Sequence, residues 1–244
     1  MSPYRITEPT CISFSGGRSS AYMLYRVLEE NNGIPDGSIV TFANTGKEDA
    51  GTLDFVQDCR IAWNVQIVWL EYGRGVVNFN TASRNGEPFD ALTNKKSYLP
   101  NPVARFCTQE LKIKPIYEYV GDMPMMLGIR ADEPRRAAKM PHHLLPLVRD
   151  NVTKADVMAF WAKQPFDLHT EAGNCDLCFL KGSNELMGLI RKNPDRAIWW
   201  ANQEKKIGAT FRPHAPSYAA MRENAINQVD MFGYDPAVEC FCGD

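Results

Sequence analysis

A glycine turn between a short strand and a helix is the feature that most constrains this sequence. Residues 10–14 are prone to form a β-strand, and the apolar residues after Arg18 recur with helical spacing. The segment Ser15–Ser20 (SGGRSS) joins them, with glycines that let the backbone approach a ligand and serines that add hydroxyl groups. The first N–H groups of the helix face this turn at the positive end of the helix dipole. We therefore expect an anion site, with phosphate the natural guest; the alternative is an ordinary serine-capped turn.

The composition favours a globular protein without membrane segments. The chain has 244 residues, 44% hydrophobic and 11% aromatic, which is enough for a sizeable core. It shows no apolar run of membrane-spanning length and no signal peptide, so we expect a soluble, cytoplasmic protein. A formal net charge of −2 does not by itself indicate nucleic acid. Seven cysteines without an export signal favour metal or redox chemistry over disulfides.

Strand and helix patterns alternate along the first third of the chain. Strands are expected at residues 38–43 and 66–71, and helices at about 18–31 and 49–63. This order predicts an α/β fold with a doubly wound parallel sheet, in which ligands bind at the carboxyl ends of the strands. The polar turn Asn44–Glu48 follows the second strand and belongs at that edge. Cys11 and Cys59 fall on core-facing positions and are expected to be structural.

The middle of the chain is less regular. Residues 73–102 predict a long loop over the site, and residues 125–129 predict a fourth strand. The loop after that strand carries three arginines, which would either pair with a phosphate or an acidic substrate or form surface ion pairs: Arg130, Arg135 and Arg136. We expect residues 1–165 to form a nucleotide-binding domain and residues 166–244 a helical, cysteine-bearing extension.

Five cysteines outside the core form the second pattern. Cys175 and Cys178 are spaced as a CxxC pair, Cys240 and Cys242 as a CxC pair, and Cys107 stands alone. Soft thiolates without histidines at ligand spacing suit zinc or an iron–sulfur cluster, and reduced, unliganded thiols are the alternative. Four cysteines would fill a cluster and leave one, so a tail cysteine is also a candidate nucleophile or persulfide carrier.

Taken in order, these motifs resemble a known family. The Ser15–Ser20 segment resembles the pyrophosphatase loop (PP-loop) of the adenine nucleotide α-hydrolase-like superfamily. Asn44–Glu48 resembles the second signature of its phosphoadenylyl-sulfate (PAPS) reductase branch, and Gly128–Arg130 with Glu133 and Arg136 is similar to its third. Arg105–Thr108 with Leu111–Lys112 looks like the same branch, near its iron–sulfur DNA-phosphorothioation sulfurtransferases. The resemblance covers roughly the first two thirds of the chain.

The resemblance implies a nucleotide site and a metal site. The nucleotide, ATP or a phosphoadenylyl sulfate, would contact Ser13, Ser15, Gly16, Gly17, Arg18, Ser19, Ser20, Asn44, Thr45, Gly46, Glu48, Gly128, Arg130 and Arg136. A [4Fe–4S] cluster, with zinc as the second candidate, would use Cys107, Cys175, Cys178, Cys240 and Cys242 as its pool of ligands. Mg²⁺ would accompany ATP. Catalytic roles would fall to Arg130 and to the tail cysteines, Cys240 and Cys242.

Three functions follow from this interpretation. In the first, a sulfurtransferase adenylates an acceptor with ATP and inserts sulfur from a cluster or a persulfide. In the second, a reductase releases sulfite from adenylyl sulfate or phosphoadenylyl sulfate. The third is a non-catalytic nucleotide-binding subunit of a modification complex, kept open because Ser19 and Asn44 stand where the family usually has acidic residues. The acceptor would be a nucleic acid or a small molecule, and a homo-oligomer is compatible with each.

Overall fold

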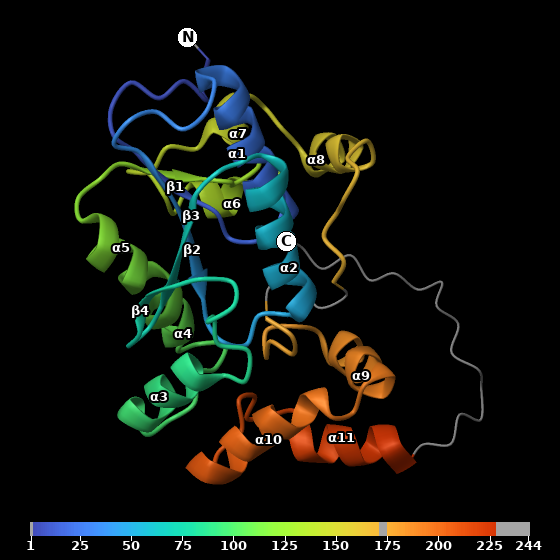
Figure 1. The fold of residues 1–244 in the computed structure, drawn as a ribbon. Coiled ribbons are helices and arrows are strands. Elements are labelled where there is room, and N and C mark those ends of the chain that lie inside the picture. Colours follow the sequence, from blue (N-terminus) through green and yellow to red (C-terminus); the bar gives the residue numbers. More distant parts are fainter. Residues whose placement is uncertain (1, 171–174, 228–244) are drawn as a thin grey trace.

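A five-stranded sheet with helices on both faces forms the centre of the computed structural model, which describes residues 2–170 and 175–227 (Figure 1). The strands are β1 (Cys11–Ser13), β2 (Ile39–Asn44), β3 (Ile67–Glu71), β4 (Gly75–Val77) and β5 (Met125–Leu127). Their order across the sheet is β4-β3-β2-β1-β5, and every neighbouring pair is parallel except β3 and β4. The predicted α/β architecture is therefore confirmed, with an antiparallel strand at one edge.

Short helices connect and flank these strands. In chain order they are α1 (Arg18–Asn31), α2 (Ala50–Ala62), α3 (Glu87–Lys96), α4 (Phe106–Thr108), the π-helical segment η1 (Gln109–Ile113), α5 (Lys114–Val120), α6 (Pro134–Ala137), α7 (Pro146–Arg149), α8 (Lys154–Trp161), α9 (Ser183–Lys192), α10 (Arg196–Ile207) and α11 (Tyr218–Asn227). The helices expected after the first two strands are confirmed as α1 and α2. The described part of the chain contains no helix with the length and apolar character needed to cross a lipid bilayer.

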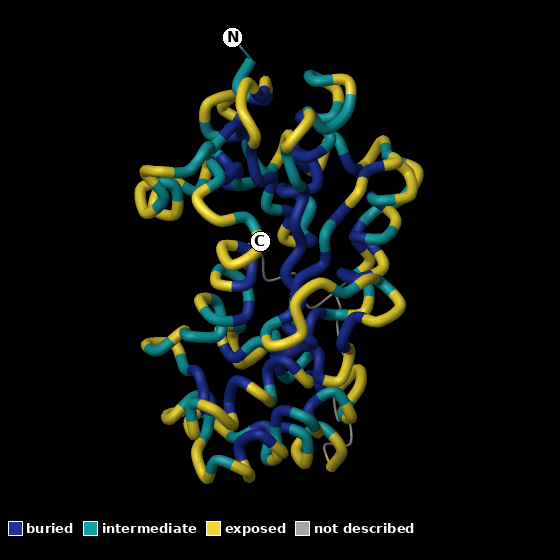
Figure 2. The backbone as a smooth tube through the Cα atoms, turned by 60° about the vertical axis from the view of Figure 1, so that its left-hand side comes forward, coloured by how far each residue is buried: buried dark blue, intermediate teal, exposed yellow. Residues whose placement is uncertain are grey.

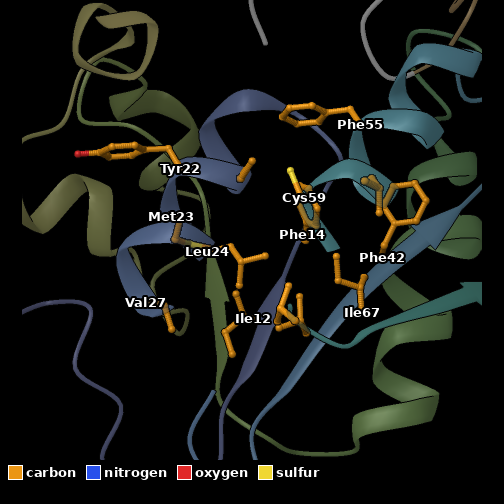
Figure 3. Packing of buried hydrophobic residues seen from close by; sticks show 14 of the residues in the cluster. Ile12, Phe14, Tyr22, Met23, Leu24, Val27, Phe42, Phe55, Cys59 and Ile67 are labelled. Carbon is orange, nitrogen blue, oxygen red and sulfur yellow. The ribbon is translucent and has the colours of Figure 1, made fainter. Parts of the chain in front are cut away.

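One face of the sheet packs against α1 and α2. Ile12 of β1 and Phe14, directly after this strand, lie in the same buried cluster as Leu24 of α1 and Phe42 of β2 (Figure 3). Cys59 of α2 belongs to this cluster and is fully buried, which confirms its structural role. Helix α8 closes the cluster from outside, since Trp161 packs edge-on against Phe55 at a ring-centroid distance of 4.9 Å.

The opposite face packs against α5. Cys11 alternates with Ile12 along β1, so its side chain joins Ala43, Ile116 and Met125 in a separate buried cluster. Both faces of the sheet are therefore covered, as the doubly wound arrangement predicts. The central strands are accordingly buried along their length, while the connecting loops carry most of the exposed residues (Figure 2).

A third cluster lies beyond the carboxyl edge of the sheet. It joins the last three helices to α3 and η1, and Figure 1 places α3 beside α10. Its largest buried side chains are Phe89, Phe179, Trp200, Phe211 and Tyr218. Trp200 stacks on Tyr218 with ring centroids 5.4 Å apart, and Phe89 packs on both Trp200 and Phe211. The helical part of residues 175–227 therefore shares its core with residues that precede residue 165.

The prediction of a long loop at residues 73–102 is wrong. This segment contains β4, which pairs antiparallel with β3, and α3, whose Phe89 and Leu92 are buried in the third cluster. Gly75 within β4, and Gly86 and Pro88 at the start of α3, hide these elements in the sequence, because short elements held by tertiary packing have weak local signals.

The chain order creates one topological switch point. Strands β2 and β3 extend the sheet on one side of β1, whereas β5 adds to its other side. The loops after β1 and β5 therefore lie next to each other at the carboxyl edge, where α/β sheets of this kind bind ligands.

Candidate nucleotide site and thiol cluster

The turn after β1 has a backbone that only glycine fits. Gly16 has φ +80°, and a Cβ atom built there would lie 2.7 Å from Cγ2 of Thr52 and 3.1 Å from the ring of Phe42. The chain thus turns directly over α2. Gly17 is the N-cap of α1 without a side-chain hydrogen bond, so the first N–H groups of this helix remain directed at the turn.

Serine hydroxyls close this turn. Ser20 Oγ accepts a hydrogen bond from the N–H of Ser15 at 3.1 Å and donates one to the carbonyl of Gly17 at 2.9 Å. The hydroxyls of Ser15 and Ser20 are 2.9 Å apart. Ser13, also assigned to the nucleotide site, is the last residue of β1 and pairs in register with Thr41 and Leu127. The loop is thus held in shape by its own side chains, while Ser15 is exposed.

The side chain of Arg18 binds Asp167 and Leu168 rather than a residue of the glycine turn. Its guanidinium makes two hydrogen bonds to the carboxylate of Asp167, at 2.7 and 2.9 Å, and a third to the carbonyl of Leu168. Trp161 Nε1 donates to the carbonyl of Arg18 at 3.1 Å. In this structure Arg18 therefore ties the start of α1 to residues 161–168, and its predicted contact with a nucleotide stays a prediction.

The loop after β5 closes on the glycine turn. A Cβ atom at Gly128 would lie 2.6 Å from Cα of Ser20, so this position needs glycine for the two backbones to approach. Arg130 is 5% exposed and donates from Nη1 to Ser19 Oγ at 2.9 Å. Its Nε pairs with Asp132 at 2.9 Å. The structure thus brings Gly128, Ser19 and Arg130 together at the switch point, as the motif assignment requires.

The third assigned arginine lies further out. Arg136 pairs with Glu133 at 2.9 Å, and its side chain is 55% exposed. Arg135 is exposed as well. For Arg136 the surface ion-pair alternative describes what the structure shows, whereas Arg130 is buried beside the loop.

The turn after β2 is built around a buried carboxylate. Asn44 donates from Nδ2 to Glu71 Oε1 at 2.6 Å and to the carbonyl of Ser83 at 2.9 Å, while its Oδ1 accepts from the N–H of Gly46. Glu71 also accepts from Ser83 and Arg74. The amide of Asn44 is thus used inside the protein, where it fixes the turn; contact with a ribose or base stays a prediction.

Glu48 ends this turn in a fully buried position. Its Oε1 accepts a hydrogen bond from Thr45 Oγ1 at 3.0 Å and pairs with Lys112 Nζ at 3.0 Å. Burial raises the pKa of Glu48, and the charge of Lys112 opposes that rise. Burial alone would lower the pKa of Lys112, but the negative charge of Glu48 raises it above its usual range, so Lys112 is a cation.

Three of the five candidate cysteines gather beside this pair. Residue 175 forms an isolated antiparallel bridge with residue 48, which places the CxxC pair next to the turn after β2. Burial raises the pKa of Cys107, Cys175 and Cys178, and the charge of Cys178 raises those of Cys107 and Cys175 further. The three thiols therefore lie within electrostatic reach of one another, although Cys107 is far from the CxxC pair along the chain.

These thiols are candidate ligands for a metal centre, with an iron–sulfur cluster and zinc as the two predicted occupants. Among residues 2–170 and 175–227, no three Cys, His, Asp or Glu side chains are placed to hold one metal ion. Each cysteine of a [4Fe–4S] cluster binds a different iron, so its sulfurs need not converge on one point. Cys107, Cys175 and Cys178 are free cysteines, and whether they bind a cluster stays a prediction. The assigned residues Cys240 and Cys242 lie outside the described residues.

One ion pair and two hydrogen bonds of Asp176 hold the CxxC segment in place. Lys47 Nζ pairs with Asp176 at 2.9 Å, Asp176 accepts from Trp200 Nε1 at 2.9 Å, and its N–H donates to the carbonyl of Lys47. Sequence reasoning did not single out Asp176 or Glu71, and it placed Lys112 only within the Leu111–Lys112 motif. Glu71 could have been identified from one feature of the sequence, because it is a charged residue at the end of an otherwise apolar strand.

Comparison with known proteins identifies one family relationship. No protein-family model matches the sequence. The sequence is 32% identical over 207 residues to a protein of Escherichia phage lambda named "Uncharacterized nin region protein ORF290", and the match covers 75% of this chain and 70% of that protein. The chain therefore belongs to the same family as the nin region protein ORF290 of phage lambda.

Proposed function

We propose that this protein performs adenine-nucleotide-dependent sulfur chemistry, as a PP-loop sulfurtransferase that activates an acceptor with ATP. The observation that carries the proposal is the closure of the β5 loop on the glycine turn, with Arg130 hydrogen-bonded to Ser19 at 2.9 Å. A thiol cluster stands on the neighbouring turn of the same sheet edge. A phosphate-binding loop next to soft metal ligands suits a reaction in which ATP adenylates an acceptor and sulfur from the thiol site then displaces AMP.

The phosphate end of the nucleotide would lie against the start of α1. Backbone N–H groups at Gly17 and the next residues form the positive end of this helix dipole and would stabilise charge on the phosphate as it leaves. Arg130 would add a fixed positive charge to the same oxygens, because its guanidinium is already held by Ser19 and Asp132. Gly128 keeps the two loops close enough for one phosphate to touch both.

The part of the site where sulfur is transferred would lie next to the thiols. Cys107, Cys175, Cys178 and one of the tail cysteines, Cys240 or Cys242, would hold the centre, and the other tail cysteine would be free to carry a persulfide. A [4Fe–4S] cluster bound there would supply sulfide or polarise a sulfur-bearing substrate. Lys112 and Glu48 set the charge around these ligands.

Two other functions share the same site. A reductase would bind phosphoadenylyl sulfate and release sulfite after attack by a tail cysteine on the sulfate sulfur. A non-catalytic nucleotide-binding subunit would bind ATP without turnover. The pairing of Ser19 with Arg130, where a carboxylate would otherwise bind Mg²⁺, is the observation that keeps the second alternative open.

Nucleotide titration and product analysis separate these functions. We expect ATP to bind in calorimetry and Arg130→Met to weaken binding by about tenfold or more, since a charge-assisted hydrogen bond contributes about 1.5–3 kcal/mol. Arg135→Met, which removes an exposed charge further along the same loop, is the matched control and should bind normally. Pyrophosphate release from ATP supports the sulfurtransferase, and sulfite release from phosphoadenylyl sulfate with a thiol donor supports the reductase. Absence of binding of either nucleotide would contradict all three.

A further inference from the structure

Glu48 is a buried carboxylate with one oxygen unused. Its side chain is 0% exposed, and its Oε1 is shared between Lys112 and Thr45. Within the described residues, Oε2 is buried and has no hydrogen-bond partner. A buried carboxylate oxygen without a hydrogen-bond partner reduces the free energy of unfolding. We therefore expect Glu48 to have a role beyond fixing the turn after β2.

Lys112 is the only cation that Glu48 pairs with among the described residues, and it is held tightly. The π-helical segment η1 carries Lys112 directly after the helix that contains Cys107, and such segments are frequent at functional sites. Its ammonium lies 3.0 Å from Glu48 Oε1, with the side chain 26% exposed. Without this carboxylate the lysine would be free to extend into solvent.

The pair lies beside the thiols. Residue 48 forms an isolated backbone bridge with residue 175, and Lys112 lies in the segment that directly follows the helix with Cys107. Burial raises the pKa of all three thiols, and the positive charge of Lys112 opposes that rise at each of them.

We propose that Glu48 is a positioning residue that fixes the ammonium of Lys112 beside the thiols, and that this pair sets the reduction potential of the metal centre they hold. The inference rests on the iron–sulfur centre of the proposed function. Net charge and hydrogen bonding around a cluster set its potential, and a fixed cation favours the reduced, more negative state.

The test compares midpoint potentials of the anaerobically reconstituted full-length protein, followed by electron paramagnetic resonance during dithionite titration. Glu48→Gln keeps a hydrogen-bond acceptor for Lys112 and removes one negative charge, so the potential should shift to more positive values. Adding Lys112→Met to E48Q removes the cation without leaving an orphaned carboxylate, and the potential should then shift to more negative values than in E48Q. Glu118→Gln and Lys206→Met are the matched controls, because each removes one charge from a surface ion pair. Both should leave the midpoint potential unchanged.

Each outcome has one meaning. Iron-loaded variants with the wild-type potential would overturn this inference and leave the proposed function intact. A wild-type protein that binds nucleotide but no iron would overturn this inference and the iron–sulfur part of the proposed function, whereas absence of nucleotide binding would overturn the proposed function as a whole. If E48Q does not retain iron, Lys112→Arg and Lys112→Met decide, since a more negative potential in the methionine variant supports the inference and equal potentials refute it.

Discussion

Replacing Gly16 by alanine should be among the most damaging single-methyl changes in this protein. The new Cβ would lie 2.7 Å from Thr52 Cγ2, 3.1 Å from the Phe42 ring and 3.3 Å from Val56 Cγ2. All three neighbours are fully buried, so none can move into solvent. The clash adds an overpacking cost of about 1–3 kcal/mol.

The backbone adds a second, separable cost. Gly16 has φ +80°, and placing an L-residue in that region costs roughly 1–2 kcal/mol. The sum is about 2–5 kcal/mol, a large part of the roughly 5–15 kcal/mol that typical domains have. Gly73→Ala is the matched control, because Gly73 has φ +73° and no atom of the described residues lies within 4 Å of the point that its Cβ would occupy.

Urea unfolding monitored by tryptophan fluorescence measures both variants against the wild type. We expect the free energy of unfolding of G73A to fall by the backbone cost alone. That of G16A should fall by about 1–3 kcal/mol more than that of G73A. Equal losses in the two variants would refute the reasoning that the glycine turn is pressed against α2.

Three further predictions concern other parts of the fold. Thr153→Ala should reduce the free energy of unfolding by about 1 kcal/mol in urea titration, because it removes the capping box that Thr153 and Asp156 form at the start of α8. For Asp167, partial burial raises the pKa, but hydrogen bonds from Arg18 and the N–H of Leu168 more than offset this and leave the pKa below its ordinary value of 3.8. The ion pair of Asp167 with Arg18 therefore stabilises the fold when the pH is above 3.8, and this stabilisation is lost as the pH falls through the lower pKa of the folded state. In Asp167→Asn the free energy of unfolding should therefore fall less steeply below about pH 5 than in the wild type. An unchanged pH dependence would contradict this. Gly128→Ala should weaken nucleotide binding in calorimetry, because its Cβ would lie 2.6 Å from Ser20 Cα and push the β5 loop away from the glycine turn; normal affinity would contradict the closure of the two loops on one ligand.

The sequence was most informative where local patterns and tertiary packing agree. The strand, glycine turn and helix around Gly16, and the strands β2, β3 and β5, follow from apolar runs bounded by turn residues. The capping box at the start of α8 is a local signal of the same kind, because it uses only neighbouring side chains. These features depend on residues within about ten positions of one another along the chain.

Features that depend on distant partners could not be predicted. Helix α3 is stabilised by packing of Phe89 against Trp200, which lies far along the chain, and nothing near residue 89 indicates that contact. Likewise, the sequence identified Arg18 as a loop residue but carried no sign of its partner Asp167. The pairing of Lys112 with Glu48 has the same origin, since it exists only because η1 packs beside the turn after β2.

The central claim is that thiols beside a nucleotide loop hold an iron–sulfur centre. Anaerobic purification followed by iron and acid-labile sulfide analysis tests it most directly. We predict iron and sulfide in equal amounts, roughly four of each per chain for a [4Fe–4S] cluster, lost on Cys175→Ser but retained on Cys11→Ser. A colourless protein that holds one zinc ion per chain, or no metal, would contradict the claim.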